Sequence, residues 1–225
     1  MGAATVALAG CSGPFSTLEP RGPVAGSIAQ LWWGMLGGAL VLLALVLALF
    51  ALVMLAPRRA ARVSGRNWIL WGGLGLPALV LPPLVIWALI AGERILPHPG
   101  QNVAVVEVEA WQFGWTFRYP QYGDVETQNI LHLPVGQPVD LHLSSRDVIH
   151  GFWIPQLGGK LDAVPGHVNV LRLQADETGV FAGQCAEFCG VAHLEMRFET
   201  HVHAPEDLAR ALGFAADSQP EEAQP

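Results

Sequence analysis

Cysteine is scarce in this sequence. Cys11, Cys185 and Cys189 are the only three among 225 residues. Three thiols are too few for a disulfide framework, and their spacing gives a lone cysteine near the start and a pair near the end. No C-x-x-C-H motif occurs, so no c-type haem is attached to this chain. Internal repeats are absent as well.

Basic residues are also few, and they are placed unevenly. The chain has 12 Lys and Arg against 19 Asp and Glu, and from Gly100 onward 17 acidic side chains stand against 6 basic ones. The resulting net charge of about −11 argues against nucleic acid as a partner and favours a basic protein drawn in electrostatically. Solubility alone also explains such a surface.

Two long runs contain no charge at all, Leu31–Ala56 and Trp68–Gly92. At about 1.5 Å per helical residue, each is long enough to cross a hydrocarbon core of ~30 Å. We therefore expect two transmembrane helices. Prolines in the second run predict a kink, which packed membrane helices tolerate; they are Pro77, Pro82 and Pro83.

Arginines without carboxylates separate the two runs, and they predict the orientation. Arg58, Arg59, Arg62 and Arg66 lie between them. By the positive-inside rule this loop is cytoplasmic, and both termini are on the outer side of the membrane. Leu8-Ala9-Gly10-Cys11 resembles the lipobox of bacterial lipoproteins, which predicts acylation of Cys11 on that same side. Residues 1–4 lack the basic residue that opens a signal peptide.

The second half alternates apolar and polar residues with period two, which is typical of half-buried strands. The runs are Val103–Glu109, Trp111–Tyr119, Pro138–Leu143, His167–Leu173 and Leu194–His203. Short strands separated by Gly, Pro, Asn and Asp predict an antiparallel sandwich or a Greek-key barrel. A helical stub is expected over Pro205–Leu212, followed by an acidic disordered tail.

These patterns divide the chain into five segments. We expect a signal and N-terminal segment (1–30), two transmembrane helices with the Arg-rich loop (31–92), a linker (93–101), a β-domain (102–204), and the stub with its tail (205–225).

Soft metal ligands gather in the segment from Cys185 to Met196. Two thiols, the imidazole of His193 and a thioether fall within 12 residues, and His150 supplies a second imidazole upstream. This set suits copper rather than calcium or magnesium. From spacing alone four assignments stay open: two coppers sharing both thiolates, one blue copper, a structural zinc, or a disulfide. Only the first uses every side chain.

The pattern C-x3-C-x3-H-x2-M, preceded by H-x-F-W-x-P, resembles the CuA signature of cytochrome c oxidase subunit II. The resemblance covers nearly the whole chain and implies a membrane α-helical hairpin plus an all-β, cupredoxin-like Greek-key sandwich. It implies that Cys185 and Cys189 bridge two coppers. His150 and Met196 would complete one copper, and His193 with the carbonyl of Glu187 the other.

Two further roles follow from the same resemblance. The side chain of Glu187 would reach a magnesium ion at the interface with subunit I. In the family, one Trp of an aromatic strand admits the electron from cytochrome c, and counting back from Tyr119-Pro120 places Phe113 at that position. Trp111 and Trp115 remain candidates for that role, although most aromatics of such a strand simply line one face.

The resemblance implies an electron-accepting subunit in the bacterial inner (plasma) membrane. It would pass electrons from cytochrome c to the haem of subunit I and contact other oxidase subunits, with its copper domain on the periplasmic side. A quinol oxidase subunit II would lack the copper ligands that are present here. A membrane-tethered copper carrier is the alternative of a different class. Outside the signature, His132, His142, His201 and His203 are interpreted as packed or surface residues, with no ligand signal near the last two.

Overall fold

The structure is a computed structural model, and it describes residues 12–97 and 103–214. The predicted lipidation of Cys11 and the predicted acidic tail lie outside these residues. The described chain forms two compact units, one over 30–95 and one comprising the rest. Each is treated by itself.

The first unit is a pair of apolar helices connected by a short basic segment. Helix α2 spans Pro23–Leu55 and ends just before Pro57, which begins the short helix α3, Pro57–Ala60. A second short helix, α4, Gly65–Asn67, has Ser64 as its N-cap, whose side chain accepts from the backbone N–H of Asn67. The chain continues through a π-helical segment, η2, Trp68–Gly75, into α5, Leu76–Ile95.

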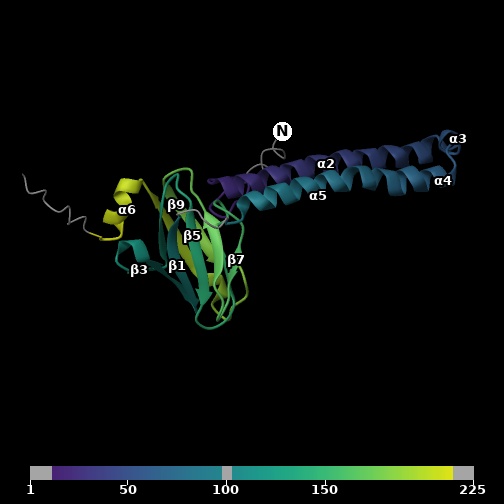
Figure 1. Cartoon of the computed structure of the whole chain (residues 1–225). Coiled ribbons are helices and arrows are strands. Elements are labelled where there is room, and N and C mark those ends of the chain that lie inside the picture. The colour runs from purple at the N-terminus through teal and green to yellow at the C-terminus, as the bar shows by residue number, and fades with distance from the viewer. Residues whose placement is uncertain (1–11, 98–102, 215–225) are drawn as a thin grey trace, which may run out of the picture. The chain divides into compact units, whose positions relative to one another are not determined.

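Helices α2 and α5 run side by side (Figure 1), and the ring of Trp87 lies against Gly34, where a Cβ would come within 2.2 Å of it. Both helical stretches, Pro23–Leu55 and Gly65–Glu93, are long and apolar enough to cross a membrane. Helices that are apolar on all sides are typical of membrane spans. The expectation of two long apolar helices is confirmed, although they extend beyond the uncharged runs.

The second unit is a β sandwich of two five-stranded sheets (Figure 1). The first sheet has the order β3-β2-β1-β5-β8, and the second β4-β10-β9-β6-β7. The strands are β1 Ala104–Trp111, β2 Gly114–Tyr119, β3 Val125–Gln128, β4 Ile130–Pro134, β5 Val139–Ser145, β6 His150–Trp153, β7 Leu161–Ala163, β8 Asn169–Leu173, β9 Gly179–Cys185 and β10 Arg197–His203. Short 3-10 turns occupy Pro120–Tyr122 and His193–Glu195, and α6 covers Pro205–Ala211.

The predicted sandwich and helical stub are confirmed, but the expectation of purely antiparallel sheets was wrong. β1 pairs in parallel with β5, and β4 pairs in parallel with β10. Alternation gives the face that a residue occupies but not the direction of its partner strand. The strand expected over Leu194–His203 begins only at Arg197, because a 3-10 turn occupies His193–Glu195.

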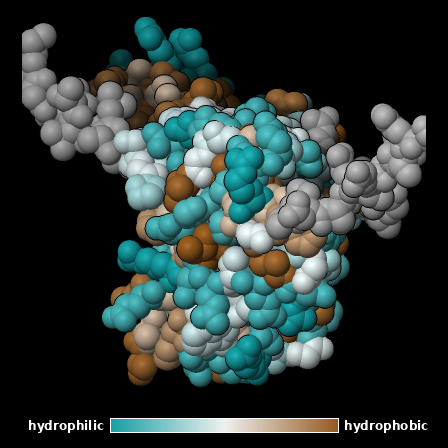
Figure 2. Space-filling view, turned by 90° about the vertical axis from the view of Figure 1, so that its left-hand side faces the viewer, coloured by the Kyte–Doolittle hydropathy of each residue, from teal (hydrophilic) through white to brown (hydrophobic). Residues whose placement is uncertain are grey.

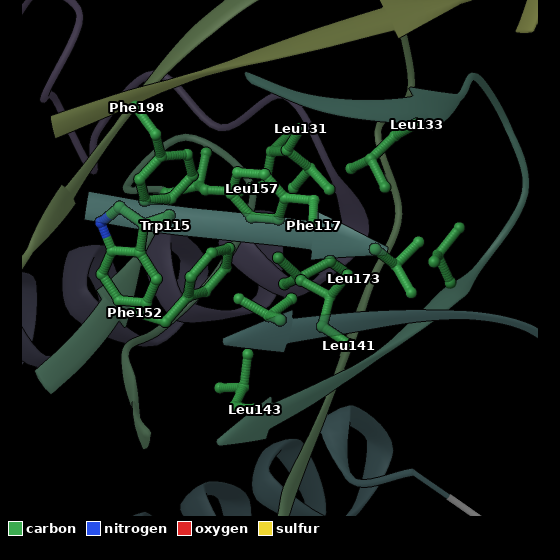
Figure 3. Packing of buried hydrophobic residues seen from close by; sticks show 14 of the residues in the cluster. Trp115, Phe117, Leu131, Leu133, Leu141, Leu143, Phe152, Leu157, Leu173 and Phe198 are labelled. Carbon is green, nitrogen blue, oxygen red and sulfur yellow. The ribbon is translucent and has the colours of Figure 1, made fainter. Parts of the chain in front are cut away.

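The core lies between the sheets and is rich in aromatic rings (Figure 3). Trp115, Phe117, Phe152 and Phe198 pack with ring centroids 4.8–6.4 Å apart. Leucines from both sheets fill the rest of the space that Figure 3 shows: Leu131, Leu133, Leu141, Leu143, Leu157 and Leu173. On the face of this unit shown in Figure 2, hydrophilic residues are interspersed with hydrophobic ones. The rigid end of this core supports the candidate site.

Candidate metal centre

The predicted ligand segment is the loop between β9 and β10. These strands pair antiparallel, with Arg197 opposite Gln184. Cys185 N donates to Met196 O at 2.9 Å, so the two ends of the loop are tied together by a backbone hydrogen bond. The 3-10 turn at His193–Glu195 then turns the imidazole of His193 back toward Cys189.

His150 approaches from the neighbouring strand. It begins β6, where Phe152 pairs with Cys185 of β9, and Ala186 N donates to Gly151 O at 2.8 Å. A Cβ at Gly151 would lie 2.8 Å from the carbonyl carbon of Ala186, so the close approach of strand and loop depends on glycine. Strand pairing thus brings His150 close to Cys185, although they are 35 positions apart in the sequence.

Six donor atoms converge here, each 3.2–3.9 Å from a cysteine sulfur. The sulfurs of Cys185 and Cys189 are 3.8 Å apart, and both thiols are free. The other distances are Cys185 Sγ to His150 Nδ1 3.9 Å and to Glu187 O 3.2 Å, and Cys189 Sγ to His193 Nδ1 3.6 Å and to Met196 Sδ 3.7 Å. Two sulfurs bound to one tetrahedral ion at about 2.3 Å lie about 3.8 Å apart, so the observed spacing fits shared metal binding.

The centre is shielded from water. His150 is fully buried, Met196 is 1 % exposed, and both cysteines are 5 % exposed. His150, Cys185 and Cys189 form a buried group whose ligand atoms all lie within 4.8 Å of one another. The structure therefore brings together all the copper ligands that the sequence predicts.

Asp147 was missed by the sequence analysis. His150 Nε2 donates to Asp147 Oδ1 at 2.8 Å, which leaves Nδ1 facing the sulfurs. The carboxylate also accepts from the backbone N–H groups of Gln112 and Val148, each at 2.7 Å. Burial raises the pKa of Asp147, but these hydrogen bonds outweigh burial and lower the pKa below its ordinary value. The sequence signal that could have identified Asp147 is its position three residues before the candidate ligand His150.

The thiol of Cys189 is protonated in the metal-free protein. Burial, together with the nearby Cys185, raises the pKa of Cys189 to about 11. Because a thiolate is the ligand form, metal uptake at this position must release a proton.

The side chain of Glu187 lies outside the buried donor set. Its carboxylate accepts from Lys160 Nζ at 2.8 Å, and Lys160 also pairs with Asp162 at 3.1 Å. The hydrogen bond from Lys160 lowers the pKa of Glu187. Glu187 thus offers its backbone carbonyl to the sulfur centre and its carboxylate to the surface.

The three aromatic candidates occupy different places. Phe113 packs on the ligand loop, since a Cβ at Gly190 would lie 3.1 Å from its ring. Its neighbour Gln112 donates from Nε2 to Cys189 O at 2.6 Å. Trp115 is buried in the core with its ring 6.1 Å from that of His150. Trp111 lines a surface groove of about 570 Å³ between charged side chains of the first sheet.

Three histidines that the sequence analysis treated as isolated lie together. His132 on β4 faces His201 on β10 in the parallel register, and His203 follows two residues on. The prediction that the last two have no ligand signal near them was wrong. The reason is that β4 and β10 pair across about 70 residues of chain, which spacing along the sequence does not reveal.

Comparison with known proteins points to one family. The family "Cytochrome C oxidase subunit II, periplasmic domain" matches residues 120–202. The chain is 34 % identical over 212 residues to cytochrome c oxidase subunit 2 of Alkalihalophilus pseudofirmus, covering 87 % of this chain and 61 % of the relative. It is 30 % identical over 229 residues to quinol oxidase subunit 2 of Bacillus cereus, covering 95 % of this chain and 77 % of the relative.

A shorter match and a solved structure complete the comparison. Cytochrome c oxidase subunit 2 of Thermostichus vulcanus is 48 % identical over 104 residues, 46 % of this chain and 31 % of the relative. This chain thus spans only part of these cytochrome c oxidase relatives. The crystal structure of the periplasmic domain of subunit II of cytochrome oxidase from Bradyrhizobium japonicum aligns with a TM-score of 0.48 and 27 % identity, covering 53 % of this chain and 94 % of that one.

Proposed function

Since the chain belongs to the cytochrome c oxidase subunit II family, we propose that it is the electron-accepting subunit of a haem–copper oxidase. It takes electrons from a cytochrome c at a binuclear copper centre and passes them to the haem of subunit I, where oxygen is reduced.

The number of converging donors carries this proposal. Three side chains and one backbone carbonyl gather around the two cysteine sulfurs, which makes six donors in all. A structural zinc takes four ligands in a tetrahedron, and a mononuclear blue copper takes one cysteine. Two thiolates shared by two ions accommodate all six donors. In this assignment His150 and Met196 complete one ion, and His193 and the carbonyl of Glu187 complete the other.

When bound, the copper pair supplies one-electron transfer chemistry. The chain's contribution is to hold the ligands still. Asp147 fixes the orientation of the His150 imidazole, and the tied ends of the β9–β10 loop fix the distance from Cys185 to Met196. Ligands that are locked by packing and hydrogen bonds move little when the charge of a centre changes. Burial keeps bulk water from the sulfurs.

Phe113 is the best placed of the three candidates for admitting the electron. It packs on Gly190, the residue after Cys189, and its neighbour Gln112 bonds to the carbonyl of Cys189. Around the same loop, Phe188, Leu194 and Val191 are 79 %, 80 % and 100 % exposed. An exposed apolar group beside a redox centre, within an acidic domain, suits docking of a basic cytochrome c or of another oxidase subunit.

Glu187 remains the candidate for a magnesium ligand at the interface with subunit I. Its carboxylate is exposed on the surface, where a second chain could complete the coordination. Because Lys160 Nζ pairs with this carboxylate at 2.8 Å, a bound ion has to displace that ammonium group. Lys160→Met therefore strengthens binding of Mg²⁺ if this assignment holds.

The charge of the helical unit supports a topology. By the positive-inside rule, the basic segment between α2 and α5 favours the cytoplasm, with the β unit on the periplasmic side. Acylation of Cys11 would anchor the N-terminus on the same side.

Copper analysis and electron paramagnetic resonance of the oxidised full chain in detergent test the function. Two coppers per chain with a seven-line hyperfine pattern support electron acceptance, and both Cys185→Ser and Cys189→Ser abolish the pattern. One copper with four lines, or zinc alone, favours the tethered copper carrier. Absence of copper in a folded chain favours a quinol oxidase subunit, a class to which the Bacillus cereus relative belongs.

A further inference from the structure

The outer face of the second sheet carries a group of three imidazoles. His132 on β4 lies opposite His201 on β10, and His203 is two residues further along that strand. Residues two apart in a strand point to the same face, so all three side chains project from one side of the sheet. All three are partly buried rather than freely exposed. This cluster is separate from the ligands assigned to copper.

The spacing of the cluster suits one metal ion. His132 Nδ1 and His203 Nε2 are 2.9 Å apart. Two nitrogens bound to one ion at about 2.0–2.1 Å lie roughly 2.9–3.4 Å apart, depending on the bond angle. The ring centroids of the three histidines are 5.1, 5.6 and 6.4 Å apart. Imidazoles that share an ion have centroids roughly 5–6 Å apart, so the His132–His203 and His132–His201 pairs are suitably spaced. His201 has to reorient toward His203 before all three side chains bind one ion.

The surroundings favour the ligand form of these side chains. His201 Nε2 donates to Glu199 Oε2 at 2.8 Å, which leaves Nδ1 free to bind, and ligating histidines commonly pair with a carboxylate in this way. Burial and the neighbouring His203 and His201 lower the pKa of His132 to about 4, so its imidazole is neutral at physiological pH. His132 also lines a cavity of about 270 Å³.

From this geometry we propose that His132, His201 and His203 form a second metal site, which binds a divalent transition metal such as Zn²⁺ independently of the copper centre. Three imidazoles suit zinc, and an open fourth position remains for water. The alternative is that His132 and His203 merely share a hydrogen bond.

Zinc binding to the copper-loaded full chain in detergent tests the site. Equilibrium dialysis against Zn²⁺ followed by metal analysis is expected to show one saturable zinc in addition to copper. His132→Gln and His203→Gln weaken zinc binding at least tenfold. His142→Gln, which changes a partly buried histidine on β5 of the other sheet, serves as the matched control and leaves zinc binding unchanged.

Retention of the copper spectrum in each histidine variant shows that the chain is still folded. Cys185→Ser loses copper but keeps zinc, which separates this site from the proposed electron-accepting centre. The proposal is overturned if the unaltered chain binds no saturable zinc. It is also overturned if His132→Gln and His203→Gln bind zinc as tightly as the control His142→Gln, or if Cys185→Ser loses zinc binding.

Discussion

The contact between Asp147 and His150 determines which imidazole nitrogen faces the sulfurs. Asp147 accepts four hydrogen bonds, and only one of them comes from His150. Two come from backbone N–H groups and one from the Ser145 hydroxyl, so the carboxylate is itself held in place. This chain of contacts links the β1–β2 turn, through Gln112, to a metal ligand on β6.

Asp147→Asn is expected to weaken copper binding by about 10–100-fold, because partners of ligating histidines contribute that much to metal affinity. A competition titration of the full chain with a copper chelator measures the change. Asp176→Asn, which alters an exposed carboxylate near Gln174, is the control. Equal affinity for the Asp147→Asn variant and the unaltered chain would refute a positioning role.

Copper binding is also expected to depend on pH through Cys189. Its raised pKa means that a proton must leave when the metal binds, and protons compete more strongly as the pH falls. Between pH 8 and pH 6 the apparent affinity should therefore fall at least about tenfold per pH unit. Chelator competition at both pH values measures this, and a flat profile would contradict it.

At this scale the sequence predicted which candidate ligands lie together but not their neighbours. C-x3-C-x3-H-x2-M lies within one loop, so its spacing alone gathers four candidate ligands. Asp147 had no such pattern, because its importance depends on the direction in which His150 points. The three clustered histidines escaped notice because pairing of β4 with β10 brings together residues 71 positions apart.

The β9–β10 hairpin is the element that holds the candidate centre, and its loop meets the β1–β2 turn at Gly190. Gly190 has a φ of +142°, which side-chain-bearing residues rarely adopt. The Phe113 ring and the Gln112 amide of the β1–β2 turn would both lie 3.1 Å from a Cβ there, so these side chains would have to shift to admit one. Two turns from different sheets therefore meet at one glycine.

Gly190→Ala should lower the free energy of unfolding of the β unit by about 1–3 kcal/mol, the cost of one strained backbone position. Urea unfolding followed by tryptophan fluorescence measures this. Gly159→Ala is the control, since a Cβ there would have only an ordinary contact with Ile28 at 3.7 Å. If both substitutions have the same effect, the loop is not constrained at Gly190.

Strands with clear alternation were predicted within a few residues, whereas five others were missed: β3, β4, β6, β7 and β9. Several of these are short, and β6 and β7 have only four and three residues. Such strands are stabilised by their neighbours in the sheet rather than by a pattern of their own. The sequence pattern also misplaced the turn between β1 and β2, which lies at Gln112–Phe113, because apolar residues continue through it.

At the scale of the whole molecule, the apolar hairpin and the charged segment between its helices predict the topology. Trypsin should cleave at Arg58, Arg59, Arg62 or Arg66 in inverted membrane vesicles and spare these sites in intact spheroplasts. Immunoblotting of the β unit detects the fragment. Cleavage of this segment from the periplasmic side would reverse the assigned orientation.

The ligand loop joins two adjacent, already paired strands, and this has a consequence for evolution. Five of the six donors lie between Cys185 and Met196, while the sheets are held together by residues elsewhere. A few substitutions or one deletion in that loop could erase the proposed copper centre and leave a foldable protein. Proteins that evolve from this one could thus use a different electron donor while keeping the same β-sandwich fold.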